Sequence, residues 1–477
     1  MAGLVIQTID GKTMALSTDA LDAFLGELRG RLCLPGDPGY DEARTLWNAM
    51  IDKHPAAVVR AAGASDVIQT VRLAAKHGLL LSVRGGGHNI AGNAVCDAGL
   101  MLDLSRMDSV RVNPTERTAR VGPGARLADL DKETQAFGLA TPVGINSTTG
   151  VAGLTLGGGF GWLSRKYGLT VDNLLSADVV TAAGELVHTN DTDHPDLFWA
   201  IRGGGGNFGV VTSFKFRLHP VGPQVIAGLI VHPWASARQV LLEYRRFVAR
   251  APDELSCWVV MRKAPPLPFL PQEVHGKEVL VLALCHAGDL ASGEKAAAPF
   301  KAIGKPIADV VGPHPFAGWQ TAFDPLLTPG ERNYWKSHDF VDLEDGLIDV
   351  LLDGIGRLPS PQCEIFVGNL GGAINRVPAG ATAYPHRNVN FVMNVHTRWS
   401  DPSQDKACIA WARALYDAAA PFATGGVYVN FMPDDEVQRV RSGAYGPNYD
   451  RLAKVKAKYD PRNLLRMNQN IAPSVPA

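Results

Sequence analysis

Three glycine-dense segments within about 130 residues constrain the backbone more than any other feature of this chain. They span residues 84–89, 157–161 and 202–209. Glycine adopts positive φ angles without strain, and its N–H groups stay open to a ligand because no Cβ covers them. One such segment is usually a turn, but three beside β-branched or leucine-rich runs predict a large anionic ligand lying along the main chain.

The composition narrows the class of protein. The 477 residues are 46% hydrophobic and 19% charged, which is typical of a globular protein with two domains. The net charge of −1 and the lack of a basic stripe argue against nucleic-acid binding and favour a small-molecule substrate. The six cysteines have no CxxC spacing, so no metal site is expected. Without a recognisable signal peptide or membrane span, the expected location is the cytoplasm.

The hydrophobic pattern differs between the two parts of the chain. Residues 57–60, a helix from a Ser65 cap to Gly78, and residues 79–83 form a predicted βαβ unit that runs into the first glycine segment. Residues 225–425 hold no comparable glycine cluster. Within them, residues 390–396 alternate polar and apolar side chains, which predicts an antiparallel strand with one face toward water or a ligand. A basic amphipathic helix is predicted over 449–459.

Two common phosphate-binding motifs do not fit the glycine segments. Gly204, Gly206 and Gly209 match the dinucleotide fingerprint by spacing, but residues 210–216 are β-branched and alternating where that fingerprint requires a helix. No glycine segment ends in the Gly-Lys-Ser/Thr of a P-loop. The ligand is therefore expected to bind in another kind of fold.

Five motifs resemble those of the berberine-bridge-enzyme-like flavoproteins of the vanillyl-alcohol-oxidase superfamily. They lie at residues 84–89, 144–161, 167–173, 199–209 and in the C-terminal stretch from Tyr459-Asp460-Pro461 to 468–471. The similarity extends in order over nearly the whole chain, and 150–161 is most similar to bacterial members such as the 6-hydroxy-D-nicotine oxidases. The resemblance implies an α+β fold. A PCMH-type FAD-binding domain would span 1–222, with its core at about 50–220. A substrate domain at 223–425 would have an antiparallel β-sheet covered by helices, and a C-terminal segment at 426–477 would return to the FAD domain.

The resemblance implies FAD as cofactor, and the chemistry of the residues suits that cofactor. Glycine-loop N–H groups form nests for a pyrophosphate, and the hydroxyls of Ser147 and Thr148 are additional donors. In the family, the residue at His88 carries an 8α-histidyl bond to the flavin. Many relatives add a cysteine link, but that position is Asn146 here, so a single attachment is predicted. The predicted cofactor-binding residues are Arg84, Gly85, Gly86, Gly87, His88, Asn89, Gly92, Gly144, Ser147, Thr148, Thr149, Gly150, Gly153, Gly157, Gly158, Gly159, Phe160, Gly161, Gly209, Val211, Asn468 and Asn470.

The usual catalytic bases of the family are missing. One family position, a glutamate after a Gly-Gly pair, corresponds to Arg376, and another, a tyrosine, corresponds to Phe431. Arginine stays protonated and cannot accept a proton. Three explanations remain open: the substrate needs no strong base, as with an amine; another residue serves, with His396, His338 and Tyr445 as candidates; or Arg376 binds an anionic group or stabilises an oxyanion.

The predicted function is an FAD-dependent oxidoreductase. It would transfer a hydride from a C–H group of an amine, alcohol, sugar or natural-product intermediate to flavin N5, with O₂ as acceptor. Two alternatives stay open, namely a dehydrogenase with another acceptor and a flavin-binding protein with a non-redox cyclase or binding role. The chain is expected to be a monomer or homodimer.

Overall fold

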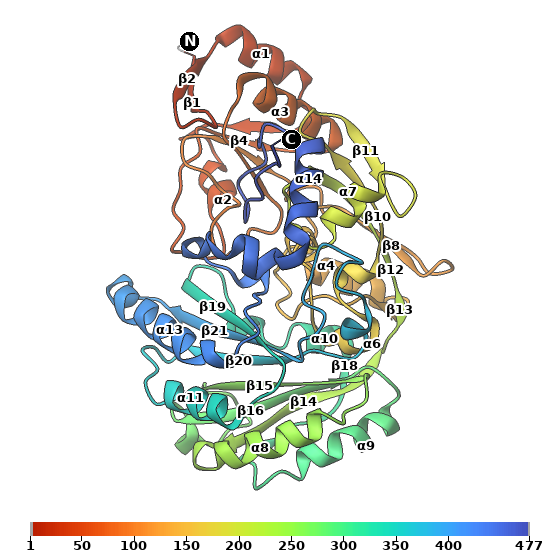
Figure 1. The fold of residues 1–477 in the computed structure, drawn as a ribbon, viewed down its shortest axis with the longest axis vertical. Helices are drawn as coiled ribbons and strands as arrows, with labels where there is room; N and C mark the ends of the chain where they lie inside the picture. The colour runs from red at the N-terminus through yellow and green to blue at the C-terminus, as the bar shows by residue number, and fades with distance from the viewer. Residues whose placement is uncertain (1–2, 476–477) are drawn as a thin grey trace.

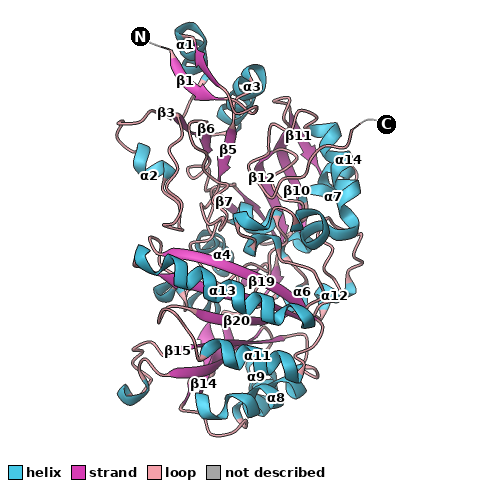
Figure 2. Cartoon of the chain, turned by 60° about the vertical axis from the view of Figure 1, so that its left-hand side comes forward, coloured by secondary structure: helices cyan, strands magenta, loops and turns pink. Residues whose placement is uncertain are grey.

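The computed structural model describes residues 3–475 and has two halves stacked along its longest axis. One half holds the N-terminal elements and the C-terminal helix α14 (Tyr449–Tyr459), and the other is built on a large sheet from the middle of the chain (Figure 1). The cartoon in Figure 2 shows the same division from another side. Segments from both ends of the sequence therefore share one half of the molecule.

The first half contains a four-stranded sheet that carries the first glycine segment. Its strand order is β3 (Arg31–Cys33), β4 (Ala57–Arg60), β6 (Leu100–Asp103) and β5 (Leu81–Arg84). Strands β4 and β5 both run parallel to β6, and α3 (Ala64–His77) connects them, which confirms the predicted βαβ unit. The predicted Ser65 cap is wrong, because Gly63 precedes the helix without a side-chain cap. Instead, the buried carboxylate of Asp66 accepts hydrogen bonds from backbone N–H groups just before β3 and just before α3.

A second, antiparallel sheet of five strands lies beside it. Its order is β11 (Leu186–Thr189), β10 (Leu174–Val180), β12 (Val210–Arg217), β8 (Thr118–Val121) and β7 (Val110–Asn113). Strand β12 follows the third glycine segment directly, and α7 (Pro195–Ile201) precedes it. The absence of a helix after the glycines, as the sequence predicts, means that this segment does not form a dinucleotide fingerprint.

The other half is an antiparallel sheet with helices on one face. Its order is β17 (Ala308–Asp309), β14 (Gln224–Pro233), β16 (Glu278–His286), β15 (Leu255–Lys263), β20 (Glu364–Asn369), β21 (Phe391–Trp399) and β19 (Arg332–Phe340), and β18 (Gly312–Pro315) also pairs with β14. The helices are α8 (Ala237–Val248), α9 (Leu290–Lys301), α11 (Asp345–Ile355) and α13 (Asp405–Ala419). In Figure 1, α8 and α9 lie at the bottom of this half, and α13 lies level with β21. Helix α8 buries Val240, Leu241, Tyr244 and Val248, a helical spacing that places one apolar face on the sheet.

The predicted strand at 390–396 lies within β21 and has the predicted two faces. Phe391, Met393 and Val395 pack into the helix-covered core. Asn394 and His396 point to the opposite face, toward the first half of the molecule, and are buried there. This second face is the one that positions the candidate site.

The remaining strands and α-helices are short or lie outside the three larger sheets. They are β1 (Leu4–Gln7), β2 (Thr13–Leu16), α1 (Thr18–Glu27), α2 (Tyr40–Arg44), α4 (Leu127–Gln135), β9 (Leu139–Ala140), α5 (Val151–Leu156), α6 (Ser164–Tyr167), β13 (His219–Pro220), α10 (Phe316–Gln320) and α12 (Ala373–Arg376). An apolar cluster that includes Trp162, Trp258 and Tyr428 fills the junction between the halves.

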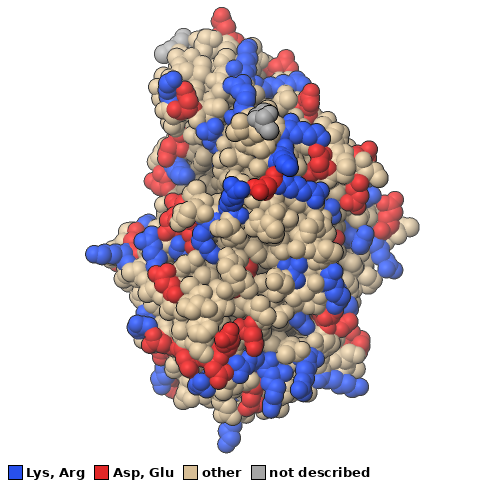
Figure 3. All heavy atoms as spheres, in the orientation of Figure 1, with Lys and Arg blue, Asp and Glu red and all other residues tan. Residues whose placement is uncertain are grey.

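The surface carries intermixed charges. Acidic and basic side chains alternate over the face drawn in Figure 3. Within residues 3–475, all six cysteines are buried and unbridged, and no cluster of three metal-ligating side chains is found. No helix in the same span combines the length and the apolar character that crossing a bilayer requires.

Candidate active site

A cavity of about 340 Å³ lies where the two halves meet. All three glycine segments line it, together with residues of the C-terminal segment from Leu465 to Gln469 and side chains from β15, β19, β20 and β21. One elongated space therefore contacts nearly every motif that the sequence singled out.

The first and second glycine regions approach each other backbone to backbone along this cavity. A Cβ on Gly86 would lie 2.3 Å from the Gly150 nitrogen, and a Cβ on Gly150 would lie 2.4 Å from the Gly86 nitrogen. No side chain fits at either position without moving the main chain. The resulting wall is bare backbone, which can approach a flat or anionic ligand closely.

Most of the predicted binding residues lie on the cavity wall, and several do not. Those on the wall are Gly85, Gly86, Gly87, His88, Asn89, Gly144, Thr149, Gly150, Gly153, Gly157, Phe160, Gly209, Val211 and Asn468. Those outside the wall are Arg84, Gly92, Ser147, Thr148, Gly158, Gly159, Gly161 and Asn470.

Two predicted donors are occupied within the protein. Ser147 donates its N–H to Asp324 at 2.9 Å and its hydroxyl to the same carboxylate at 2.5 Å, so neither donor is free for a pyrophosphate. The Thr148 hydroxyl also points within the protein, to Asn146 Oδ1 at 2.8 Å. The expectation that these hydroxyls bind the anion is therefore corrected. Asp324 lies far along the chain, and nothing in the local sequence predicts its contact with Ser147.

His88 is held by one stacked ring and at one nitrogen. Its ring stacks on Trp47 with centroids 5.0 Å apart, and its Nε2 lies 3.0 Å from the Thr148 hydroxyl. Burial, together with the positive charges of Arg126 and Arg84, lowers the pKa of His88 to about 3. The imidazole is therefore neutral at any physiological pH.

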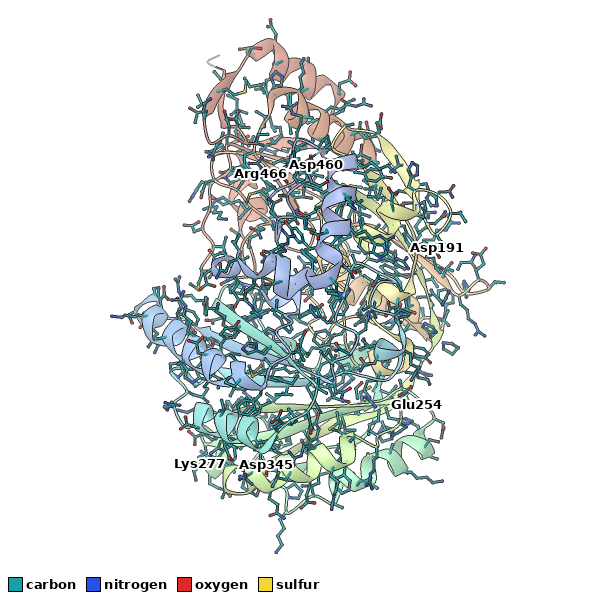
Figure 4. All side chains as sticks on the ribbon, viewed as in Figure 1. Asp191, Glu254, Lys277, Asp345, Asp460 and Arg466 are labelled. Carbon is teal, nitrogen blue, oxygen red and sulfur yellow. The ribbon has the colours of Figure 1, made fainter. Side chains whose placement is uncertain are left out.

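A buried ion pair fixes the C-terminal segment against the third glycine segment. Lys456 donates to Asp460 at 2.7 Å, to the Asn207 carbonyl at 2.7 Å and to the Leu465 carbonyl at 3.2 Å. Asp460 in turn accepts the N–H groups of residues 464 and 465. Asp460 and Arg466 lie beside α14 in Figure 4, and Arg466 donates to the carbonyl of Ile9 near the N-terminus. These contacts place Asn468 on the cavity wall.

Four strands contribute one row of side chains on the other side of the cavity. Arg262, Glu364, His396 and Trp335 are direct cross-strand neighbours on β15, β20, β21 and β19. Arg262 donates to Glu364 Oε2 at 2.6 Å, and His396 Nδ1 lies 2.8 Å from Glu364 Oε1. Burial raises the pKa of Glu364, but Arg262 and the hydrogen bond from His396 outweigh it and hold that pKa at about 2.

Glu364 therefore stays ionised and can only accept hydrogen bonds, which assigns the His396 proton to Nδ1. The other nitrogen, Nε2, is buried and has no hydrogen-bond partner, and the His396 residue lines the cavity. The side-chain oxygen of Asn394, two residues earlier on the same face, is also buried and unpartnered on the cavity wall. These two acceptors need a polar ligand to satisfy them.

The other catalytic candidates lie elsewhere. Arg376 is largely exposed and pairs with Asp253 at 2.6 Å, outside the cavity, so its expected role toward an anion or oxyanion is corrected. His338 stacks on Tyr416 and bonds the carbonyl of that residue, away from the cavity. Tyr445 reaches the wall, but its hydroxyl lies 3.3 Å from the Gly204 carbonyl beside the glycine segment.

Sequence reasoning missed several wall residues. Glu364, Asn394, Asn430, Trp47 and Phe366 line the cavity without belonging to any recognised motif. Asn394 had a signal, because it shares the polar face of the predicted strand with His396. Glu364 had none, since its importance comes from its cross-strand pairing with His396.

Comparison with known proteins gives matches over the whole chain. A sequence family described as FAD binding domain matches residues 55–190, and one described as berberine and berberine-like matches 427–472. An uncharacterised FAD-linked oxidoreductase of Bacillus subtilis, YvdP, is 32% identical, with 94% of this chain and 99% of that protein covered. The (R)-6-hydroxynicotine oxidase of Paenarthrobacter nicotinovorans is 30% identical, with 94% and 97% covered. The solved structure of BBE-like 1 from Physcomitrella patens superposes with a TM-score of 0.85 at 26% identity, over 96% of this chain and 100% of that one.

Proposed function

This chain belongs to the berberine-like family of FAD-linked oxidoreductases, and we propose that it is an oxidase of small molecules in which His396 accepts the substrate proton. The observation that carries the proposal is the His396 side chain itself. His396 lines the cavity, its Nε2 is buried and has no hydrogen-bond partner, and its Nδ1 is fixed by an ionised Glu364. A neutral imidazole held in this tautomer is a competent general base.

The residues of the cavity fit FAD. The bare backbone of the Gly86 and Gly150 region offers N–H groups to an anion, and the wall continues along the third glycine segment to Asn468. We assign the binding role to the predicted residues that lie on this wall and not to Ser147, whose donors are engaged by Asp324. When bound, FAD supplies the two-electron acceptor of the reaction.

We propose a single covalent attachment through His88. The Thr148 hydroxyl has one hydrogen, which it donates to Asn146 Oδ1, so it must accept its hydrogen bond from His88 Nε2–H. Nδ1 then keeps the lone pair, and the lowered pKa of about 3 keeps that lone pair unprotonated. Asn146 stands at the position of the second-link cysteine of many relatives. It thus orients the histidine through Thr148 and forms no covalent bond to the flavin.

Substrate oxidation removes a hydride and a proton. An alcohol R₂CH–OH gives R₂C=O as its C–H bond breaks with both electrons and its O–H proton moves to His396 Nε2; an amine gives the corresponding imine. Glu364 stabilises the imidazolium that forms, and Arg262 keeps Glu364 ionised. The Asn394 amide is placed to contact the polar group of the substrate. O₂ is the proposed final acceptor, with hydrogen peroxide as its product.

An anaerobic stopped-flow experiment tests this function. The holoprotein is mixed with a panel of amines, alcohols and sugars, and loss of the visible flavin absorbance is followed for the wild type and His396→Asn. We expect at least one compound to bleach the wild-type flavin, and His396→Asn to slow bleaching by about 10²-fold or more. His338→Asn, outside the cavity, serves as the matched control. Bleaching that is equally fast in His396→Asn would contradict the assignment.

The reoxidation phase separates the alternatives. Rapid recovery of the absorbance in air with release of hydrogen peroxide supports an oxidase, whereas slow recovery indicates a dehydrogenase that uses another acceptor. If no compound bleaches the flavin, a non-redox role replaces the proposal.

We also propose the division of the chain at about residues 222 and 425, with the C-terminal segment completing the FAD-binding part. Limited proteolysis with mass analysis tests those boundaries. The monomer-or-homodimer state and the cytoplasmic location stay predictions, for which light scattering and cell fractionation are the measurements.

A further inference from the structure

A second cavity of about 80 Å³ lies beside the first on the same face of the eight-stranded sheet. The two cavities share a wall formed by Ile145, Trp258, Leu327, Glu364 and Phe366. We call the second one the side cavity. Its floor is formed by β14, β15 and β16, and its cover includes Leu267 and Phe269 of the segment that follows β15.

The chemistry of the sheet face changes along two cross-strand rows. One row runs from Val231 through Val281, Val260 and Phe366 to Asn394. The next row runs from Val279 through Arg262 and Glu364 to His396. The first row is apolar from β14 to β20 and becomes polar only at Asn394 on β21. The second row is apolar at Val279 on β16 and is charged or polar from Arg262 on β15 to His396 on β21. Arg262 and Glu364, the charged residues on the side-cavity wall, neutralise each other at 2.6 Å.

The dimensions limit what this face can hold. A cavity needs about 10–15 Å³ per water-sized group, so 80 Å³ admits about five to eight heavy atoms. Neighbouring strands are about 4.8 Å apart, so β15 and β16 lie two and three strand spacings, about 10–14 Å, from His396 on β21. A single small ring at His396 does not span the distance to β15 and β16, whereas a molecule about 10 Å long does.

From this juxtaposition we infer that the substrate is an elongated molecule with two chemically different ends, and that the side cavity binds its apolar end. That end is an aromatic ring or a branched alkyl group of about five to eight heavy atoms. The other end carries the hydroxyl or amino group that satisfies His396 and Asn394. This inference rests on the proposed function and narrows its substrate class. It favours hydrophobic alcohols and amines over oligosaccharides, because the hydroxyls of a second sugar ring would be buried without partners in the side cavity.

Binding to the oxidised holoprotein tests the inference, and it is read from the rapid shift of the flavin spectrum that precedes any bleaching. Three probes are titrated anaerobically while the flavin visible spectrum is recorded: benzyl alcohol, the longer 4-biphenylmethanol and cellobiose, a polar molecule with two rings. We expect 4-biphenylmethanol to bind at least about tenfold more tightly than benzyl alcohol. Cellobiose should bind no more tightly than benzyl alcohol.

Two variants locate the difference. Val281→Phe fills the side cavity from β16 and should reduce the preference for the longer probe to about onefold, while leaving benzyl alcohol binding unchanged. Leu267→Asn changes only the cover of the side cavity and should weaken the binding of the longer probe alone. This second variant tests the same inference if Val281→Phe does not fold. Val437→Phe, the same substitution at a 66% exposed position, is the control.

Several results would overturn the side-cavity assignment. They are equal affinity for the short and long probes, tighter binding of cellobiose, or loss of both alcohols in Val281→Phe at an unchanged melting temperature. His396→Asn separates this inference from the proposed function, because it should leave the affinity ratio of the probes unchanged. A preserved ratio with a reduction rate that does not depend on His396 would reject the proton-acceptor role and retain the side cavity.

Discussion

Replacing Glu364 with glutamine removes the carboxylate that fixes His396 while keeping the shape of the side chain. In the wild type, Glu364 Oε1 lies 2.8 Å from His396 Nδ1, and the pKa of about 2 keeps the carboxylate ionised throughout the working pH range. When substrate transfers its proton to Nε2, this anion stabilises the imidazolium. A glutamine carbonyl can still accept the Nδ1–H hydrogen bond but offers no charge.

The expected magnitude follows from that one contact. A hydrogen bond to a charged partner is worth about 1.5–3 kcal/mol, against about 0.5–1.5 kcal/mol for a neutral one. If the difference of about 1–2 kcal/mol is expressed in the transition state, the rate of flavin reduction falls about 5–30-fold. Arg262 also loses its buried partner, so a lower melting temperature should accompany the change.

The assay is anaerobic flavin reduction across about pH 5–9. Glu364 does not titrate in that range, so the wild-type profile does not report its protonation. In Glu364→Gln the imidazolium that forms lacks its anion, so the rate of flavin reduction is expected to fall across this pH range. Glu278→Gln, on β16 and outside both cavities, controls for loss of an acidic side chain from the same sheet.

Two outcomes would refute the reasoning. One is an unchanged reduction rate in folded Glu364→Gln, and the other is an equal fall in the Glu278 control.

Three further predictions concern the first half of the molecule. Thr148→Val removes the acceptor of His88 Nε2–H and should lower the fraction of flavin that stays with the protein after acid denaturation, whereas Thr148→Ser should retain it. Gly86→Ala places a Cβ 2.3 Å from the Gly150 nitrogen and should abolish the retention of FAD by the protein on gel filtration. Unchanged FAD retention would show that the two glycine segments can move apart. Burial raises the pKa of Asp131 from 3.8 to about 7, so the folded state binds its proton more tightly and stability falls as pH rises through that interval. The free energy of unfolding of Asp131→Asn should therefore exceed that of the wild type by up to about 4 kcal/mol at pH 8 but not at pH 4, as measured by chemical unfolding. An equal difference at both pH values would contradict the raised pKa.

Local signals predicted much of the fold. The βαβ unit before the first glycine segment, the strand after the third one, and the helix at 449–459 all follow from residue periodicity, and the structure has each of them. The Ser65 cap was wrong because the buried Asp66 carboxylate, which binds backbone from outside the helix, organises that turn instead. Short-range patterns identify elements well but do not identify partners that are distant in sequence.

The candidate site divides in the same way. The glycine segments and His88 were recognisable because their proposed roles depend on backbone freedom and on one residue type. Both can be identified from a short stretch of sequence. The partners of Arg376 and Ser147 could not be predicted from the sequence, because Asp253 and Asp324 come near them only in the folded chain.

The sequence by itself determined where glycine-rich backbone can approach a ligand, because a missing Cβ is a property of the residue. The proposals for the group that takes the proton and for the place of an apolar substrate end rest on the tertiary structure. Those proposals depend on strand register, which aligns Arg262, Glu364 and His396 from three strands in one row. Register is set by the packing of whole sheet faces, and no single segment of sequence contains it.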